Sequence, residues 1–153
     1  MKKKAAKQTD RATAYALAVV SGEILAGPYV RGACQRHLND LQDAGKRGFC
    51  YDEHVAAEAI AFFEEVLVLA GGQWEGRPFI LIPWQAFIVG SLFGWKRKAD
   101  DKRRFRVAFI EAGKGCGKSP LAAGVGMKGL LADHEPRAEI YAAATTQSQA
   151  MVL

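Results

Sequence analysis

The chain has 153 residues, of which 50% are hydrophobic and 24% charged, and it carries a formal net charge of +5. This length is enough for one domain with a buried core, and the composition is ordinary for a globular protein. No apolar run approaches the roughly 18 to 20 residues of a membrane span, and no apolar signal core follows the lysine-rich start, so we expect neither a membrane segment nor a secretion signal.

The helix signals of the first 80 residues come before any strong strand signal. Thr9 and Asp10 are suited to cap a first helix that stops at Gly22, and Asp52 is suited to cap a later one. The expected helices cover residues 11–20, 30–43 and 53–69. His37 has no partner at metal-ligand spacing, so we expect it to be a surface or packing residue rather than a ligand.

The second half of the chain has an α/β pattern. In chain order we expect an extended run at 79–82, a helix at 84–95, a strand at 105–110, a helix at 119–132, a strand at 138–144 and a helix beginning at Gln147. A crossover helix of this length between two apolar strands implies a parallel pair with a right-handed connection. The predicted organisation is a helical region over residues 1–80, followed by an α/β domain that begins in residues 81–153.

The loop at residues 111–119 is the most informative stretch of the chain. It reads Glu-Ala-Gly-Lys-Gly-Cys-Gly-Lys-Ser and connects the expected strand to the expected helix, so its backbone N–H groups would converge on an anion. Lys118 would reach the β- and γ-phosphates of a nucleoside triphosphate, and the Ser119 hydroxyl would bind Mg²⁺. The backbone groups that would surround the phosphates belong to Gly113, Gly115, Cys116 and Gly117.

This loop departs from the standard phosphate-loop pattern at one position. The pattern has glycine, four residues and then Gly-Lys-Ser/Thr, and its first glycine would stand where the chain has Ala112. Gly113 and Gly115 can supply the needed flexibility, because glycine accepts a positive φ. The alternative is a glycine-rich turn without a ligand, but the flanking strand and helix favour phosphate binding. The predicted fold class is therefore a P-loop NTPase with a partial parallel sheet, preceded by the helical region.

The cysteines and the basic residues constrain the compartment and the partners. Cys34, Cys50 and Cys116 are an odd set without metal-ligand spacing, so we expect free thiols in a reducing compartment and no structural metal. Seven basic and two acidic residues lie between Lys96 and Arg106. Such a segment either binds a nucleic-acid backbone or forms a solvated loop, and the segment taken by itself slightly favours the loop.

Four groups of segments, in this order and spacing, carry a resemblance to a known family. They are 19–22 with 33–38 and 40–41; Phe62 with 74–79; 81–85 with 93–95; and the phosphate loop with 130–133, 140–145 and 149–150. From about Ala14 onwards the chain resembles the N-terminal ATPase part of a bacteriophage large terminase subunit. That family is the ATP-driven motor that packages double-stranded DNA into procapsids.

The resemblance implies roles for two further residues. Pro83-Trp84-Gln85 resembles the family motif whose glutamine contacts adenine, and the two faces of a glutamine amide suit adenine's edge. The alternative for Gln85 is a surface glutamine at a helix start. Lys114 stands where the family often has arginine, so it keeps the positive charge that stabilises the transferred phosphoryl group but loses the planar fork.

The resemblance also implies partners and activity. The expected cofactors are ATP and Mg²⁺, and the expected partners are double-stranded DNA, the portal protein and the small terminase subunit, with no membrane. A full-length member would be a homo-oligomeric ATPase and endonuclease in the host cytoplasm.

Two expected parts of such a motor are missing from the sequence. No strand ending in an acidic pair follows residue 144, and no acidic nuclease cluster is present, so we expect a truncated fragment with little activity of its own. Two alternatives remain open at this point. One is a helicase-like or other P-loop NTPase, and the other is a non-catalytic module that binds DNA or the portal.

Overall fold

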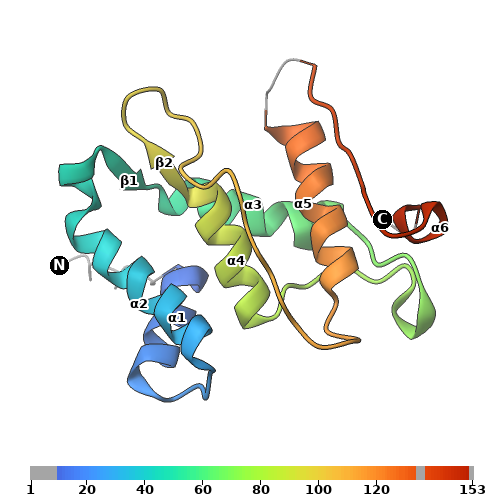
Figure 1. The fold of residues 1–153 in the computed structure, drawn as a ribbon, viewed down its shortest axis with the longest axis horizontal. Helices are drawn as coiled ribbons and strands as arrows, with labels where there is room; N and C mark the ends of the chain where they lie inside the picture. Colours follow the sequence, from blue (N-terminus) through green and yellow to red (C-terminus); the bar gives the residue numbers. More distant parts are fainter. Residues whose placement is uncertain (1–9, 134–136, 152–153) are drawn as a thin grey trace, which may run out of the picture. The chain divides into compact units, whose positions relative to one another are not determined.

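The computed structural model describes residues 10–133 and 137–151, and these form two units (Figure 1). The first unit joins Met1–Ile60 with Ile82–Arg106, and the second joins Ala61–Leu81 with Val107–Leu153. Residues 61–81 therefore pack with the phosphate-loop region, although most of them belong to the region 1–80 that the sequence predicted to be helical. The predicted capping role of Thr9 lies outside the described residues.

Three helices form the core of the first unit: α1 (Arg11–Ser21), α2 (Pro28–Asp43) and α4 (Pro83–Gly94). As predicted, the Asp10 carboxylate caps α1, accepting hydrogen bonds from the N–H groups of Ala12 and Thr13 at 3.0 and 3.1 Å. The predicted stop at Gly22 is also present, with a left-handed φ of 88°. The helices enclose an apolar cluster of Ala12, Ala16, Val19, Cys34 and Phe87.

Helix α4 packs closely on its neighbours because two of its contact points are glycines. A Cβ atom at Gly90 would lie 2.8 Å from the Cβ of Ala12, and one at Gly94 would lie 2.6 Å from Cε2 of Tyr51. Neither distance is compatible with van der Waals contact, so a side chain at either position would force the packed elements apart. These two glycines therefore set how close α4 comes to α1 and to the β1 segment.

A short antiparallel ribbon completes the first unit. Strand β1 (Phe49–Tyr51) pairs with β2 (Trp95–Arg97), and α3 (Glu53–Ala61) follows β1. The predicted cap of α3 is confirmed, since the Asp52 carboxylate accepts hydrogen bonds from two N–H groups of the first turn. The ribbon was not predicted, because three residues are too few to show the alternation that identifies a strand.

The helix expected over 53–69 is wrong in its second half. The α-helical turns end at Ala61 and continue as a π-turn, η2 (Phe62–Val66), after which the backbone is extended. Residues 67–79 then form a hairpin-like loop, in which Val68 and Pro78 make an isolated antiparallel bridge. The cause of the early stop is this pairing, because the backbone N–H groups of Leu69 and Phe79 bond across the loop instead of along a helix.

The remaining elements of the second unit are η3 (Gly72–Trp74), α5 (Lys118–Ala132) and α6 (Gln147–Ala150). Helix α5 and the start of α6 agree with the sequence prediction. The buried residues of this unit include Phe63, Phe79, Leu81 and Leu121.

The predicted parallel strands at 105–110 and 138–144 are not found among the described residues. The ribbon of β1 and β2 is antiparallel, and neither predicted segment is paired. Val107 and Phe109 are 86% and 88% exposed. An extended apolar segment becomes a strand only where a second backbone pairs with it, and among the described residues no backbone pairs with either of these two. In residues 10–133 and 137–151, no helix is both long enough and apolar enough to cross a membrane.

His37 is a buried packing residue, which is one of the two roles that the sequence predicted for it. It is 3% exposed, and its ring lies edge-on to the rings of Tyr51, Phe87 and Trp95. The indole N–H of Trp95 donates to Nδ1 of His37 at 3.0 Å, so Nδ1 carries no proton. The proton of the neutral ring therefore lies on Nε2, which is 3.0 Å from the Thr13 hydroxyl.

We predict that acidification destabilises the first unit through His37. Burial lowers the pKa of His37 below its ordinary value, with a smaller contribution from Arg36, while Asp10 and Asp40 act in the opposite direction. The unfolded chain then binds the proton more readily than the folded chain, so the free energy of unfolding should fall as the pH drops below about 6.5. Urea titrations between pH 7.5 and 5.5 measure this slope.

The matched control is the exposed His54, which forms an i,i+4 pair with Glu58. The slope should be reduced in His37→Gln and retained in His54→Gln. A slope of the same size in His37→Gln would show that other groups cause the pH dependence.

We also predict that Gly94→Ala lowers the free energy of unfolding by about 1–3 kcal/mol, because the new methyl group overlaps Tyr51 and Ala56. Gly32→Ala in α2 is the control, since a Cβ there meets no atom within 4 Å. That variant should be neutral or more stable by up to about 1 kcal/mol, because alanine favours a helix. Equal effects in the two variants would contradict the close packing at Gly94.

Candidate nucleotide-binding site

Two glycines of the loop before α5 have backbone conformations that favour glycine. Gly115 and Gly117 have left-handed φ values of 83° and 73°, and Gly117 is the N-cap of α5. In the described chain, Asp101 and Arg137 are the only residues other than glycine with a positive φ. Ala112 therefore occupies an ordinary backbone conformation, and its position does not require the glycine of the standard pattern.

The Lys118 side chain curls back over the loop that it follows. Its ammonium group donates a hydrogen bond to the Gly113 carbonyl at 2.8 Å and a second one to the Ala112 carbonyl. The cation is thus held inside the curve of the loop by two neutral acceptors. A phosphate group that entered the loop would offer charged oxygens to the same ammonium, and charge-assisted hydrogen bonds are the stronger ones.

The other predicted loop residues are available to a ligand from solvent. The side chains of Lys114, Cys116 and Ser119 are exposed, and Ser119 is in the first turn of α5. The partial positive charge of a helix N-terminus favours an anion at this point. In the described part of the chain, no cluster of three or more His, Cys, Asp or Glu residues could hold a metal ion.

Gln85 lies in the first unit, away from the loop in the sequence, and it is not the surface residue of the alternative prediction. It is 4% exposed, and its Oε1 accepts a hydrogen bond from the N–H of Ile82 at 3.1 Å. The side chain therefore caps the N-terminus of α4. A carbonyl oxygen has two lone pairs, so this bond leaves one acceptor position on the amide.

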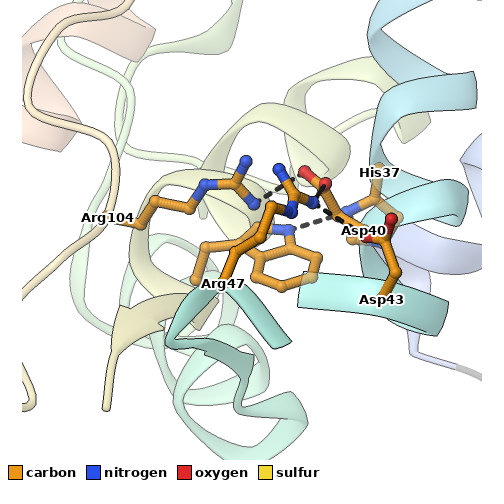
Figure 2. Close-up of polar contacts among 6 residues, drawn as sticks. His37, Asp40, Asp43, Arg47 and Arg104 are labelled. Atoms are coloured by element: carbon orange, nitrogen blue, oxygen red, sulfur yellow. Dashed lines mark hydrogen bonds and ion pairs between the residues drawn. The ribbon is translucent and has the colours of Figure 1, made fainter. Parts of the chain in front are cut away.

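A buried ion-pair network in the first unit was missed by sequence reasoning. Asp40 is 5% exposed, and Figure 2 shows the guanidinium groups of Arg47 and Arg104 directed at its carboxylate. Arg104 Nη1 lies 2.6 Å from Asp40 Oδ2 and forms an ion pair with it. Arg47 also pairs with Asp43 at 2.9 Å. No local signal joins Asp40 to a residue 64 positions later, so only the folded chain reveals this pair.

Arg104 is held by aromatic rings as well as by charge. Its guanidinium lies 4.6 Å from the ring centroid of Phe49 and 5.2 Å from that of Trp95. Burial raises the pKa of Asp40, but the contacts from Arg47 and Arg104 outweigh it, and the pKa is lowered below its ordinary value. Asp40 is therefore ionised at neutral pH, as the partner of two cations must be.

These pairs reduce the positive charge of the basic segment. Besides Arg104 with Asp40, Lys96 pairs with Asp101 at 2.9 Å and Arg97 pairs with Asp100. At least three of its seven basic residues are thus paired with acids, which weakens the nucleic-acid interpretation of this segment.

A comparison with known protein families finds a match for the part of the chain that includes the loop. Residues 83–153 match the model of the terminase large subunit, ATPase domain. This part of the chain is similar to that family. Over residues 83–153 the match agrees with the resemblance predicted from the sequence. It covers α4, the phosphate loop and α5, and it leaves the whole helical region of residues 1–80 unmatched.

The terminase match bears on the loop and on the segment that contains Gln85. The glycine-rich turn lies in a segment that is similar to an ATPase domain, which favours nucleotide binding over a turn without a ligand. The match also begins at Pro83, so the Pro-Trp-Gln segment is included. No curated protein and no solved structure shows significant similarity to the chain.

Proposed function

We propose that this chain binds ATP at the loop 111–119 and forms the ATPase part of a bacteriophage packaging motor that moves double-stranded DNA into procapsids. The observation that supports the proposal is the terminase match over a glycine-rich loop in which Gly115 and Gly117 have left-handed φ values. The match favours this function over a helicase-like NTPase.

The phosphates would bind where the Lys118 ammonium now contacts the loop. Lys118 would exchange the carbonyls of Ala112 and Gly113 for the β- and γ-phosphate oxygens. The N–H groups of the loop, from Gly113 to Gly117, would donate to the same phosphates. Lys114, exposed on the loop, would stabilise the charge that develops on the transferred phosphoryl group.

Ser119 would hold Mg²⁺. Its hydroxyl is an oxygen ligand of the type that this ion prefers, and its exposed side chain in the first turn of α5 leaves room for one. Mg²⁺ would neutralise negative charge on the phosphates during transfer.

Gln85 would read the adenine base. Its amide N–H₂ and the free lone pair of Oε1 match the acceptor and donor on adenine's edge. The bond from Ile82 to Oε1 would hold the amide in one orientation.

In the packaging motor, we propose that the portal protein and the small terminase subunit are the protein partners. The complete protein would be a homo-oligomer in the host cytoplasm, with a nuclease activity in addition to the ATPase.

We predict that Lys118→Ala weakens ATP binding about 10- to 100-fold, because a charge-assisted hydrogen bond contributes about 1.5–3 kcal/mol. Titration calorimetry with ATP and Mg²⁺ measures the dissociation constant. Lys98→Ala is the charge-matched control, since Lys98 lies in the first unit and should not affect the affinity. Equal affinities for wild type and Lys118→Ala would remove the role assigned to Lys118.

A second prediction separates the two tasks of Gln85. Gln85→Glu keeps an oxygen to accept from Ile82 but loses the N–H₂ donor, so it should stay folded and lose the preference for ATP over GTP by about tenfold. Gln85→Ala should lose that preference and also some thermal stability. An unchanged ratio of ATP to GTP affinity in Gln85→Glu would contradict the adenine contact.

A further inference from the structure

The helix that carries Lys118 and Ser119 has no room for a side chain at one buried glycine. A Cβ atom at Gly124 would lie 2.2 Å from Cε1 of Phe63 and 2.9 Å from both Cδ1 and Cζ of the same ring. Phe63 is completely buried. The aromatic ring therefore rests directly on the backbone of α5.

Phe63 belongs to the π-turn η2, and its neighbour Phe62 contacts the next turn of α5. The ammonium of Lys128 lies 5.9 Å from the ring centroid of Phe62. Residues 124 and 128 are four apart, so they lie on one face of the helix. The wider spacing of a π-turn lets two consecutive phenylalanines contact this face, and π-turns are frequent at functional sites.

The π-turn is itself fixed to the rest of the second unit. The Glu64 carboxylate accepts a hydrogen bond from the N–H of Leu81 at 3.0 Å. The Phe63 ring packs on the Phe79 ring with 5.5 Å between centroids, and Phe79 N–H bonds to the Leu67 carbonyl. The Phe63 ring and its π-turn are therefore held by side-chain and backbone contacts from residues 79–81, which follow the hairpin-like loop.

We infer that Phe63 and Gly124 are positioning residues for the phosphate loop, which rests on the proposed function. Helix α5 is continuous from Lys118 to Ala132, and Gly124 is six positions after Lys118, about 9 Å along the axis. A methyl group at Gly124 forces the ring and the helix apart by roughly 1 Å, and a rigid helix carries such a shift to its first turn. Misplacement of about 1 Å at a reacting centre lowers the reaction rate by up to about 100-fold.

The test uses three variants and two readouts. Gly124→Ala adds the methyl group, Phe63→Leu/Gly124→Ala adds it with space made for it, and Gly129→Ala places it where a Cβ meets no atom within 4 Å. The first readout is the dissociation constant of ATP with Mg²⁺, measured at a temperature at which each variant is folded. The second is hydrogen exchange of the backbone amides of residues 113–121.

We expect Gly124→Ala to weaken ATP binding about tenfold or more and to speed amide exchange in the loop. Gly129→Ala should change neither readout, and the double variant should recover most of the affinity. If Gly124→Ala does not fold, the comparison becomes Phe63→Leu against the double variant, which should bind ATP more tightly than Phe63→Leu.

Two outcomes overturn the inference. One is a Gly124→Ala protein that is less stable but binds ATP with wild-type affinity, because Gly124 would then act only in packing. The other is a double variant that recovers nothing. If the wild-type protein binds no ATP while Gly124→Ala still speeds exchange in the loop, the proposed function fails and the positioning of the loop by Phe63 stands.

Discussion

Both units depend on one constraint, the close approach of a helix backbone to a neighbouring side chain at a glycine. In the first unit, Gly90 and Gly94 let α4 rest on Ala12 and Tyr51, and in the second, Gly124 lets α5 rest on Phe63. Such contacts are short and stiff, because protein interiors have no free space to absorb an added methyl group. The elements that carry Gln85 and Lys118 are therefore located by residues that contact no ligand.

The electrostatics of the two units follow different rules. In the first unit, charges are matched inside the protein, since buried Asp40 faces two arginines and Arg104 also rests on aromatic rings. In the loop of the second unit, Lys118 has only the neutral carbonyl groups of Ala112 and Gly113 as the acceptors described above. Breaking a buried pair of charges is costly, because it leaves a charge without a partner. A cation that is held by neutral acceptors forms stronger hydrogen bonds when an anion replaces them. This contrast favours Arg104 as a structural residue and Lys118 as a binding residue.

Local signals in the sequence predicted most helices and the loop. The caps at Asp10 and Asp52 and the break at Gly22 depend on neighbouring residues, so they could be read directly. The π-turn, the short ribbon and the Asp40–Arg104 pair depend on contacts between distant segments, and no single-sequence pattern records those. At 105–110 and 138–144 the sequence predicted strands that the described structure lacks. Their apolar pattern is clear, but a strand also requires a second backbone to pair with.

The loop's departure from the standard pattern has a conformational explanation. A glycine is required where φ is positive, and in this loop the positive values fall at Gly115 and Gly117. What position 112 supplies is a carbonyl group that accepts from Lys118, and any residue can supply that. Ala112 is therefore compatible with phosphate binding, since the pattern at this position reflects a backbone conformation that this chain does not adopt there. Positions 115 and 117 should tolerate no such replacement, because a residue with a Cβ there would be strained by its left-handed φ.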